Sequence, residues 1–443
     1  WDTHVHVTQW AQTVGRLDVS GAGTATEVLR PVAEELHAED RPPGAPLIGF
    51  GFRDALWPDE PRVADLDAVA GRTPVVLISA DVHCGWLSST AMDLLGVPRS
   101  PGLIREHEWF DVLARLGDLP GAPLTAALQR AMQAAAARGV VGVVDMEWAP
   151  NHRCWPERLD AGLDLLRVRT GVYPDHLEEV LHAGLRTGRP LPGGRGLLTM
   201  GPLKIISDGS LNTRTAFCHA PYATGDPAHP RGQQTVPVAE LVDLLGRARA
   251  GGLQAAVHAI GDGANTLALD AFARSGAAGS VEHVQLVRPE DVERMALLGV
   301  TASVQPAHLL DDRDVTEELW PGRTDRVFVL REMLEAGVHL TLGSDAPVAP
   351  LDPWLAMAAA VHRSADDRPP WHPEQHLSPA QALAASTDGW GTLAEGAPGD
   401  VALLDADPLA DADAGSAAAA GRLRGMQVAA TVVAGRLTHD TVR

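Results

Sequence analysis

The sequence predicts an α/β protein whose main domain is a (β/α)8 TIM barrel, with an insertion after the first strand and a small C-terminal β-sandwich domain. From about residue 125 onward, short and almost continuously apolar runs alternate with amphipathic stretches at helical spacing. This alternation is typical of βαβ units, in which helices cover both faces of a parallel sheet. With the histidine-containing run at the start, the apolar runs number eight, and eight such units close naturally into a barrel.

The expected strands are, in chain order, WDTHVHV (1–7), VVGVVDM (140–146), LRVRTGVYP (166–174), PLKIISDG (202–209), LQAAVHAIGD (253–262), SVEHVQL (280–286), VTASVQP (300–306) and HLTLGSDAP (339–347). The helical stretches between them include TAALQRAMQAAAARG (125–139) and VAELVDLLGRARAGG (238–252). A doubly wound open sheet is the alternative fold. It has little support, because no GxGxxG fingerprint opens a helix after the first strand.

Two regions interrupt the alternation. Residues 38 to about 124 are rich in Pro, Gly and Trp and are too long for a simple connection between a strand and a helix, so we expect a subdomain inserted at the first loop. Residues 391–443 contain short apolar runs separated by turn residues, which favours a small β-domain outside the barrel. The predicted organisation is a barrel domain at 1–390, with the inserted subdomain at about 38–124, and a β-domain at 391–443.

The charge and the cysteine content restrict the class of protein. The formal net charge is −21, and such a surface repels nucleic acids and anionic membranes, so neither is an expected partner. No apolar run approaches the ~20 residues of a membrane span. The three cysteines, Cys84, Cys154 and Cys218, form no CxxC pair, which predicts reduced thiols in a cytoplasmic protein.

Six polar residues fall at the ends of five expected strands. His4 and His6 close the first strand, and at positions i and i+2 their side chains point to the same face, where they can grip one cation. The others are Lys204 on the fourth strand, His258 on the fifth, His283 on the sixth and Asp345 on the eighth. Singly, each has a structural explanation, such as a hydrogen-bonded core histidine or a helix cap. As a set at the catalytic end of a barrel, they predict a metal centre.

The motifs HVH, LKIISDGS, HAIGD, EHVQL and GSDAPV together resemble the amidohydrolase superfamily. At the fourth strand, the order Lys204, Asp208, Gly209, Arg214, Thr215, Ala216 is similar to the K-x-x-x-D-G-x-x-x-x-R-T-A pattern of its amidohydrolase family 3 branch, which includes N-substituted formamide deformylase-like enzymes. The resemblance runs from residue 1 to the C-terminus. In this family a β-sandwich is built from segments before and after the barrel, which implies that its N-terminal half is absent from this sequence.

The resemblance implies a centre of two divalent metal ions bridged by Lys204 after carboxylation by CO2. The other ligands are His4, His6 and Asp345 for one ion, and His258 and His283 for the second. Lys204 is the single lysine among 36 Lys and Arg residues, and a guanidinium cannot form the carbamate because its pKa stays above ~12. Zinc suits these ligands, with iron, manganese or cobalt as alternatives. Asp345 takes the proton of a hydroxide held between the ions and passes it to the leaving nitrogen.

The implied activity is hydrolysis of a non-peptide C–N bond, in an amide, formamide or cyclic amide of a small molecule, and the implied oligomer is a homodimer. Candidate substrate contacts are His83, Asp208, Arg214 and His308. The alternatives are a mononuclear deaminase, a lactone or phosphotriester hydrolase, and a catalytically inactive scaffold. Deaminases usually lack the strand-four lysine and carry a Glu where this chain reads HAIGD, and inactive relatives typically lose metal ligands.

Overall fold

The computed structural model contains one sheet of eight parallel strands whose order follows the chain. The structure describes residues 1–14, 16–38, 45–116, 124–391, 393–410 and 415–442. In sheet order the strands are β1 (Asp2–Val5), β7 (Gly142–Asp145), β8 (Arg167–Val172), β9 (Leu198–Ile206), β10 (Ala255–Ala259), β11 (Gly279–His283), β12 (Thr301–Val304) and β13 (Leu340–Leu342). Each coincides with one of the eight strands expected from the sequence, and the predicted barrel class is confirmed.

The first and the last strand close the sheet. The backbone N–H of Asp345 donates to the carbonyl of His4 at 2.7 Å, and the N–H of His6 donates to the carbonyl of Ala346 at 2.9 Å. These bonds join the end of β1 to the segment that follows β13. Because both partners carry predicted metal ligands, the closure itself brings the two ends of the barrel sequence into one site.

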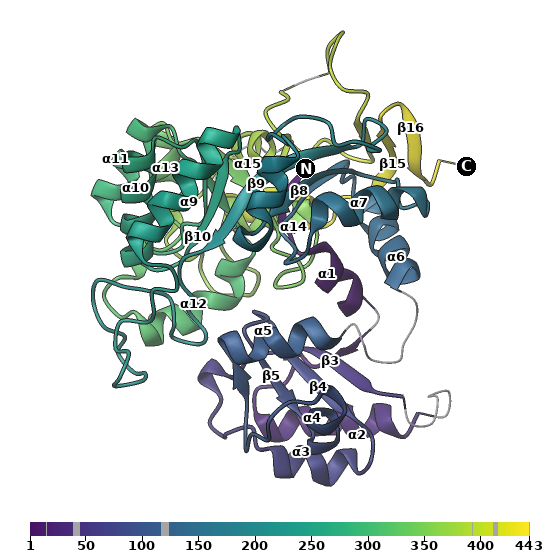
Figure 1. Ribbon diagram of the computed structural model, residues 1–443, viewed down its shortest axis with the longest axis vertical. Helices are drawn as coiled ribbons and strands as arrows, with labels where there is room; N and C mark the ends of the chain where they lie inside the picture. Colours follow the sequence, from purple (N-terminus) through teal and green to yellow (C-terminus); the bar gives the residue numbers. More distant parts are fainter. Residues whose placement is uncertain (15, 39–44, 117–123, 392, 411–414, 443) are drawn as a thin grey trace. The chain divides into compact units, whose positions relative to one another are not determined.

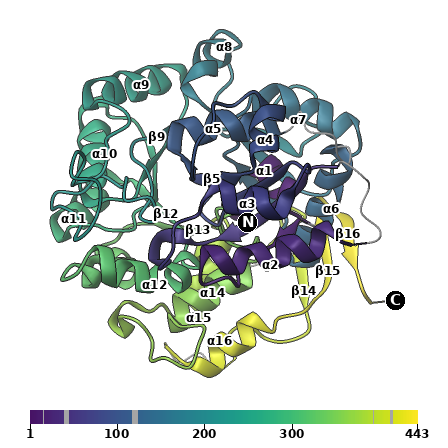
Figure 2. The same ribbon diagram turned by 90° about the horizontal axis from the view of Figure 1, so that it is seen from below.

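Helices connect the strands and lie outside them, as α9, α10 and α11 show around β9 and β10 (Figure 1, Figure 2). They are α6 (Leu124–Ala137), α7 (Asn151–Asp160), α8 (Leu177–His182), α9 (Val238–Gly251), α10 (Asp262–Ser275), α11 (Pro289–Leu298), α12 (His308–Leu319), α13 (Leu330–Glu335), α14 (Pro353–His362) and α15 (Pro379–Ser386). Gly252, Gly276 and Gly299 end α9, α10 and α11 with φ of 81°, 63° and 64°. Glycine adopts this left-handed conformation without steric cost and so turns the chain back toward the next strand.

The insertion forms a compact unit of its own, Thr8–Leu128. Its five-stranded sheet consists of β2 (Leu17–Asp18), β3 (Leu47–Phe52), β4 (Val75–Ser79), β5 (Cys84–Leu87) and β6 (Ile104–Arg105), with helices α1 (Val7–Thr13), α2 (Ala25–Leu36), α3 (Val63–Ala70), α4 (Ser89–Leu95) and α5 (Glu106–Arg115). The unit starts at Thr8 and not near residue 38, because α2 packs on β2 and β3 of this sheet. Residues 39–44 and 117–123, beside the predicted boundaries, lie outside the described ranges.

The C-terminal segment folds as a small antiparallel sheet within the same compact unit as the barrel. Its strands are β14 (Val401–Leu404), β15 (Val428–Val433) and β16 (Arg436–Asp440), and α16 (Ala417–Arg424) lies between the first two in sequence. The antiparallel pairing agrees with the predicted β-domain. None of the helices in the described part of the chain has both the length and the hydrophobicity that a membrane span requires.

Candidate metal centre

The predicted ligands lie at the C-terminal ends of the barrel strands. His4 lies in β1, Lys204 in β9 and His258 in β10, and His283 is the last residue of β11. His6 and Asp345 follow β1 and β13. Since the strands are parallel, these ends meet at one face of the barrel.

The first group of potential ligands consists of His4, His6 and Asp345. The Nε2 atoms of His4 and His6 lie 3.5 and 3.4 Å from Oδ1 of Asp345. Lys204 Nζ lies 3.1 Å from His4 Nε2. Ligand atoms around a tetrahedral Zn²⁺ are ~3.4 Å apart, so the first group already has the spacing that such an ion requires.

His283, His308 and Asp345 form a second group. In each group the potential ligand atoms lie within 4.8 Å of one another. His308 Nε2 is 3.9 Å from Asp345 Oδ2, and the ring centroids of His283 and His308 are 6.0 Å apart. His258 packs edge-on against His283, with 4.5 Å between ring centroids. All six predicted ligands therefore converge, and His308, expected only to line the pocket, lies with them.

The residues present fit divalent metal ions. The Nδ1 atoms of His6 and His283 and the Nε2 atom of His308 are buried and have no hydrogen-bond partner among the described residues. Buried polar atoms normally have a partner. In the group with Asp345, the unpaired nitrogens of His283 and His308 leave lone pairs that a divalent cation can use, while His6 directs its other nitrogen, Nε2, toward the carboxylate. Imidazole and carboxylate ligands suit zinc and neighbouring transition metals.

Lys204 is buried at 1% exposure. Burial lowers the pKa of its ammonium, and the carboxylates of Glu282 and Asp345 offset only part of that shift. A lower pKa raises the fraction of neutral amine at a given pH. The neutral amine is the form that reacts with CO2.

The other central groups are held in the protonation states that metal binding requires. Burial disfavours the carboxylate of Asp345, but the imidazoles of His4, His6 and His283 outweigh it and hold the pKa of Asp345 well below its usual value. Burial, reinforced by His258, lowers the pKa of His283 well below its usual value. Metal ligands must be deprotonated, and an ionised Asp345 beside a neutral His283 meets that condition.

Glu282 is a functional candidate that the sequence reasoning missed. Its side chain is 1% exposed, and its Oε2 lies 2.8 Å from His4 Nδ1 while its Oε1 accepts a 2.5 Å hydrogen bond from Ser280 Oγ. A carboxylate on Nδ1 fixes the ring orientation and leaves Nε2 facing the site. A charged residue inside the apolar run SVEHVQL was the available signal, since an acidic side chain is seldom buried without a partner.

The backbone at the site is held in unusual conformations. His283 has φ of 74° and Asp345 has φ of 57°, in the left-handed region that non-glycine residues rarely occupy. Such residues persist where the surroundings over-determine them. Beside Asp345, the N–H of Ser344 donates to a carboxylate oxygen of the buried Asp2 at 2.9 Å, and Asp2 also accepts from the N–H of His4.

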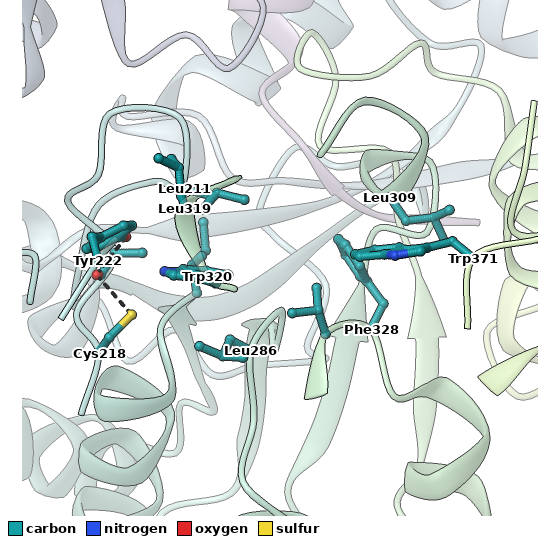
Figure 3. Packing of buried hydrophobic residues seen from close by; sticks show 12 residues of the cluster. Leu211, Cys218, Tyr222, Leu286, Leu309, Leu319, Trp320, Phe328 and Trp371 are labelled. Atoms are coloured by element: carbon teal, nitrogen blue, oxygen red, sulfur yellow. Dashed lines mark hydrogen bonds between the residues drawn. The ribbon is translucent and has the colours of Figure 1, made fainter. Parts of the chain in front are cut away.

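An apolar cluster fixes the loops that follow β9, β11 and β12 (Figure 3). It contains Leu211, Ala216, Cys218, Tyr222, Ile260, Leu286, Leu309, Leu319, Trp320, Val327, Phe328 and Trp371. Tyr222 Oη and Cys218 Sγ both donate to the carbonyl of Ala216, at 3.0 and 3.5 Å. Leu309 directly follows His308, so its packing in the cluster anchors the start of α12.

The remaining predicted substrate contacts lie in different surroundings. Asp208 is fully buried, accepts hydrogen bonds from the N–H groups of Ile260, Gly261 and Phe217, and has Oδ1 3.4 Å from His258 Nε2. Arg214 lies further along the same loop, half-buried, with φ of 60°.

His83 belongs to the inserted unit. There, its Nδ1 lies 3.0 Å from Oε2 of Glu106, and its ring packs edge-on against Phe110 with 5.3 Å between centroids. Substrate contact by Asp208, Arg214 and His83 stays a prediction.

Comparison with known proteins assigns the family. The sequence model of the amidohydrolase family matches residues 1–439. The chain belongs to the amidohydrolase family. This match covers nearly the whole chain, including the C-terminal sheet, and it confirms the resemblance that the strand-end motifs carry.

Individual relatives are similar to this amidohydrolase over most of their length. The chain is 26% identical to an N-substituted formamide deformylase of Arthrobacter pascens, over 99% of this chain and 87% of that protein. It is 28% identical to the protein LONG AFTER FAR-RED 3 of Arabidopsis thaliana, over 87% of this chain and 72% of that protein.

Among solved structures, an uncharacterized metal-dependent hydrolase from Pyrococcus furiosus has a TM-score of 0.69 at 27% identity, covering 88% of this chain and 80% of that one. Family and fold together make this amidohydrolase a metal-dependent hydrolase.

Proposed function

We propose that this amidohydrolase cleaves a carbon–nitrogen bond other than a peptide bond, in an amide, formamide or cyclic amide, at a binuclear centre containing carboxylated Lys204. The observation that carries the proposal is the position of Lys204, whose Nζ lies 3.1 Å from a nitrogen of the His4–His6 pair. An ammonium placed there would repel a metal ion. A carbamate would supply two oxygen ligand atoms that share one negative charge.

Each residue has a defined part in this proposal. His4, His6 and Asp345 hold one cation, while His258 and His283 hold the other. Lys204 reacts in its neutral form: the nitrogen lone pair attacks the carbon of CO2, an N–C bond forms, one C–O π bond becomes an anionic oxygen, and the nitrogen proton leaves to solvent. The lowered pKa of buried Lys204 favours this step.

Divalent cations bound here would supply Lewis acidity and would lower the pKa of a bound water toward neutral pH. The protein supplies the proton transfer. Asp345 is ionised, because nearby imidazoles hold its pKa well below the usual value, so it accepts a proton from the attacking water. It then donates that proton to the leaving nitrogen, which departs as a neutral amine.

The choice of a C–N bond is supported by the relative from Arthrobacter pascens, whose name describes removal of the formyl group from N-substituted formamides. A hydrolysis screen tests the choice. Protein reconstituted with Zn²⁺ or Mn²⁺ is assayed against N-formyl amines, N-acyl amines, cyclic imides, esters and phosphotriesters. We expect activity on one of the first three classes, and activity confined to esters or phosphotriesters would contradict the proposal.

The metal requirement has its own measurement. Elemental analysis of the purified protein should find bound transition metal, and chelation should abolish activity that Zn²⁺ or Mn²⁺ then restores. Hydrolysis that survives chelation without loss would exclude a metal-dependent mechanism.

A further inference from the structure

His308 follows the seventh barrel strand. It begins α12, after residues 305–307 that follow the end of β12, and the N–H of His308 donates to the carbonyl of Gln305 at 3.1 Å. Its side chain is 9% exposed, and its Nε2 has no hydrogen-bond partner within the described residues. The nearest acidic group to that nitrogen is Asp345, whose Oδ2 lies 3.9 Å away.

A structural role explains this position poorly. A core histidine is normally satisfied by a hydrogen bond, because leaving a buried ring nitrogen without one is costly. Here the unpaired nitrogen faces a carboxylate that two other histidines share. A buried imidazole nitrogen that makes no hydrogen bond and lies beside a carboxylate is a usual arrangement for a metal ligand.

His258 is placed differently from His308. Its Nε2 lies 3.3 Å from the carbonyl of Gly209 and 3.4 Å from Oδ1 of Asp208. The two histidines therefore differ in their surroundings, because His258 Nε2 already has two polar contacts in the protein and His308 Nε2 has no hydrogen-bond partner among the described residues.

We infer that His308 is a ligand of the second metal position, together with His283 and Asp345. The inference rests on the proposed binuclear centre and adds a ligand to it. Ligand atoms that share a tetrahedral Zn²⁺ are ~3.4 Å apart, so the 3.9 Å between His308 and Asp345 needs only a small side-chain adjustment. His308 thereby contributes to the site directly and not as a distant wall of the pocket.

Metal binding by wild type, His308→Ala and His339→Ala tests the inference. His339 is an exposed histidine just before β13, at the other end of the barrel, and serves as the matched control. Each metal-free protein is titrated with Zn²⁺ alone against a competing chelator, and with Co²⁺ while the visible absorption is recorded. Thermal unfolding of the metal-free proteins establishes that they are folded, and His308→Asn repeats the test with a smaller loss of volume.

Wild type and His339→Ala are expected to bind two ions. His308→Ala and His308→Asn should bind one ion normally and the second at least 10-fold more weakly, with a weaker or shifted Co²⁺ spectrum. Two ions bound by His308→Ala with wild-type affinity would overturn the inference, even if its hydrolysis rate falls. No ion bound by wild type would instead contradict the proposed function itself, and the inference with it.

Discussion

The two ends of the barrel are built from the same eight strands but differ in whether their polar side chains have partners. At the C-terminal ends, histidines surround Asp345, and several ring nitrogens are buried without a hydrogen-bond partner among the described residues. At the N-terminal ends, two arginines of β8 are paired with aspartates. Arg167 binds Asp400 through two hydrogen bonds of 2.6 and 3.0 Å, and Arg169 pairs with Asp388 and lies over the ring of Trp1.

A cavity of about 710 Å³ lies at the N-terminal end, lined by Thr3, Arg167, Ser280, Ser303, Thr341 and other residues. None of its described lining side chains has a buried polar atom without a hydrogen-bond partner. An open cavity by itself therefore does not indicate a metal site. Unsatisfied ligand atoms do, because a site that binds a cation must keep lone pairs that the protein itself does not use.

The strongest test of this difference is Lys204→Arg. Arginine keeps a long basic side chain but cannot form the carbamate, and it places a permanent positive charge at the site, so the bridge between the metal positions is lost. Metal catalysis contributes several kcal/mol, and kcat/KM should therefore fall by roughly 10³-fold or more. Elemental analysis and steady-state kinetics measure both effects.

The matched control for that variant is Arg169→Lys at the opposite end, which keeps the cation in its pair with Asp388. It should leave metal content and kcat/KM unchanged and lower the free energy of unfolding by about 1 kcal/mol or less. Two bound ions and full activity in Lys204→Arg would show that Lys204 does not bridge.

A smaller effect is expected for Glu282→Gln. The amide keeps the size of the side chain but no longer accepts the His4 Nδ1 proton as a carboxylate, so His4 is held less firmly. Loss of such a partner typically lowers metal affinity 10- to 100-fold. Chelator competition with Zn²⁺ measures the change. Ser280→Ala, which removes only the hydrogen bond to the other oxygen, should weaken binding less, and the reverse order would argue against positioning by Glu282.

At the N-terminal end, Arg167→Ala should affect stability alone. The pair with Asp400 is partly buried and connects β8 to the C-terminal sheet, so its loss should lower the free energy of unfolding by about 1–2 kcal/mol. Arg436→Ala removes a more exposed pair with Asp164 and should cost about 0.5 kcal/mol. Chemical denaturation measures both. A fall in metal content in Arg167→Ala would show that the two ends are not independent.

The smallest effect concerns the thiols. Cys84 and Cys218 are buried and Cys154 is partly exposed. Burial raises the pKa of Cys218 to about 12, and the thiolate is the reactive form. Thiol titration of the native protein should therefore modify Cys154 slowly and the other two only after denaturation. Rapid modification of Cys218 would show that the apolar cluster beside the metal end opens in solution.

Local patterns in the sequence were sufficient for the eight strands and for the six residues at their ends, because strand and helix periodicities extend over a few residues only. The HxH pair and the single lysine could also be recognised from the sequence, because their chemistry depends on residue type. The pattern around Lys204 and Asp208 resembled the amidohydrolase family, and the match of the family model confirmed that resemblance. The start of the inserted unit could not be predicted as closely, because the packing of α2 on β2 and β3 assigns Thr8 onward to that unit.

By itself, the sequence determined the strand order, the alternation with helices and the set of metal-binding residue types. Only the tertiary structure decided which groups share one site. Closure of β1 on the segment after β13 brings His4, Asp345 and Lys204 into contact. The same closure gives Glu282 its role and turns His308 toward Asp345. The contacts of His4 join residues 200 or more positions apart, and no local periodicity encodes them, because they follow from how eight strands meet around one axis.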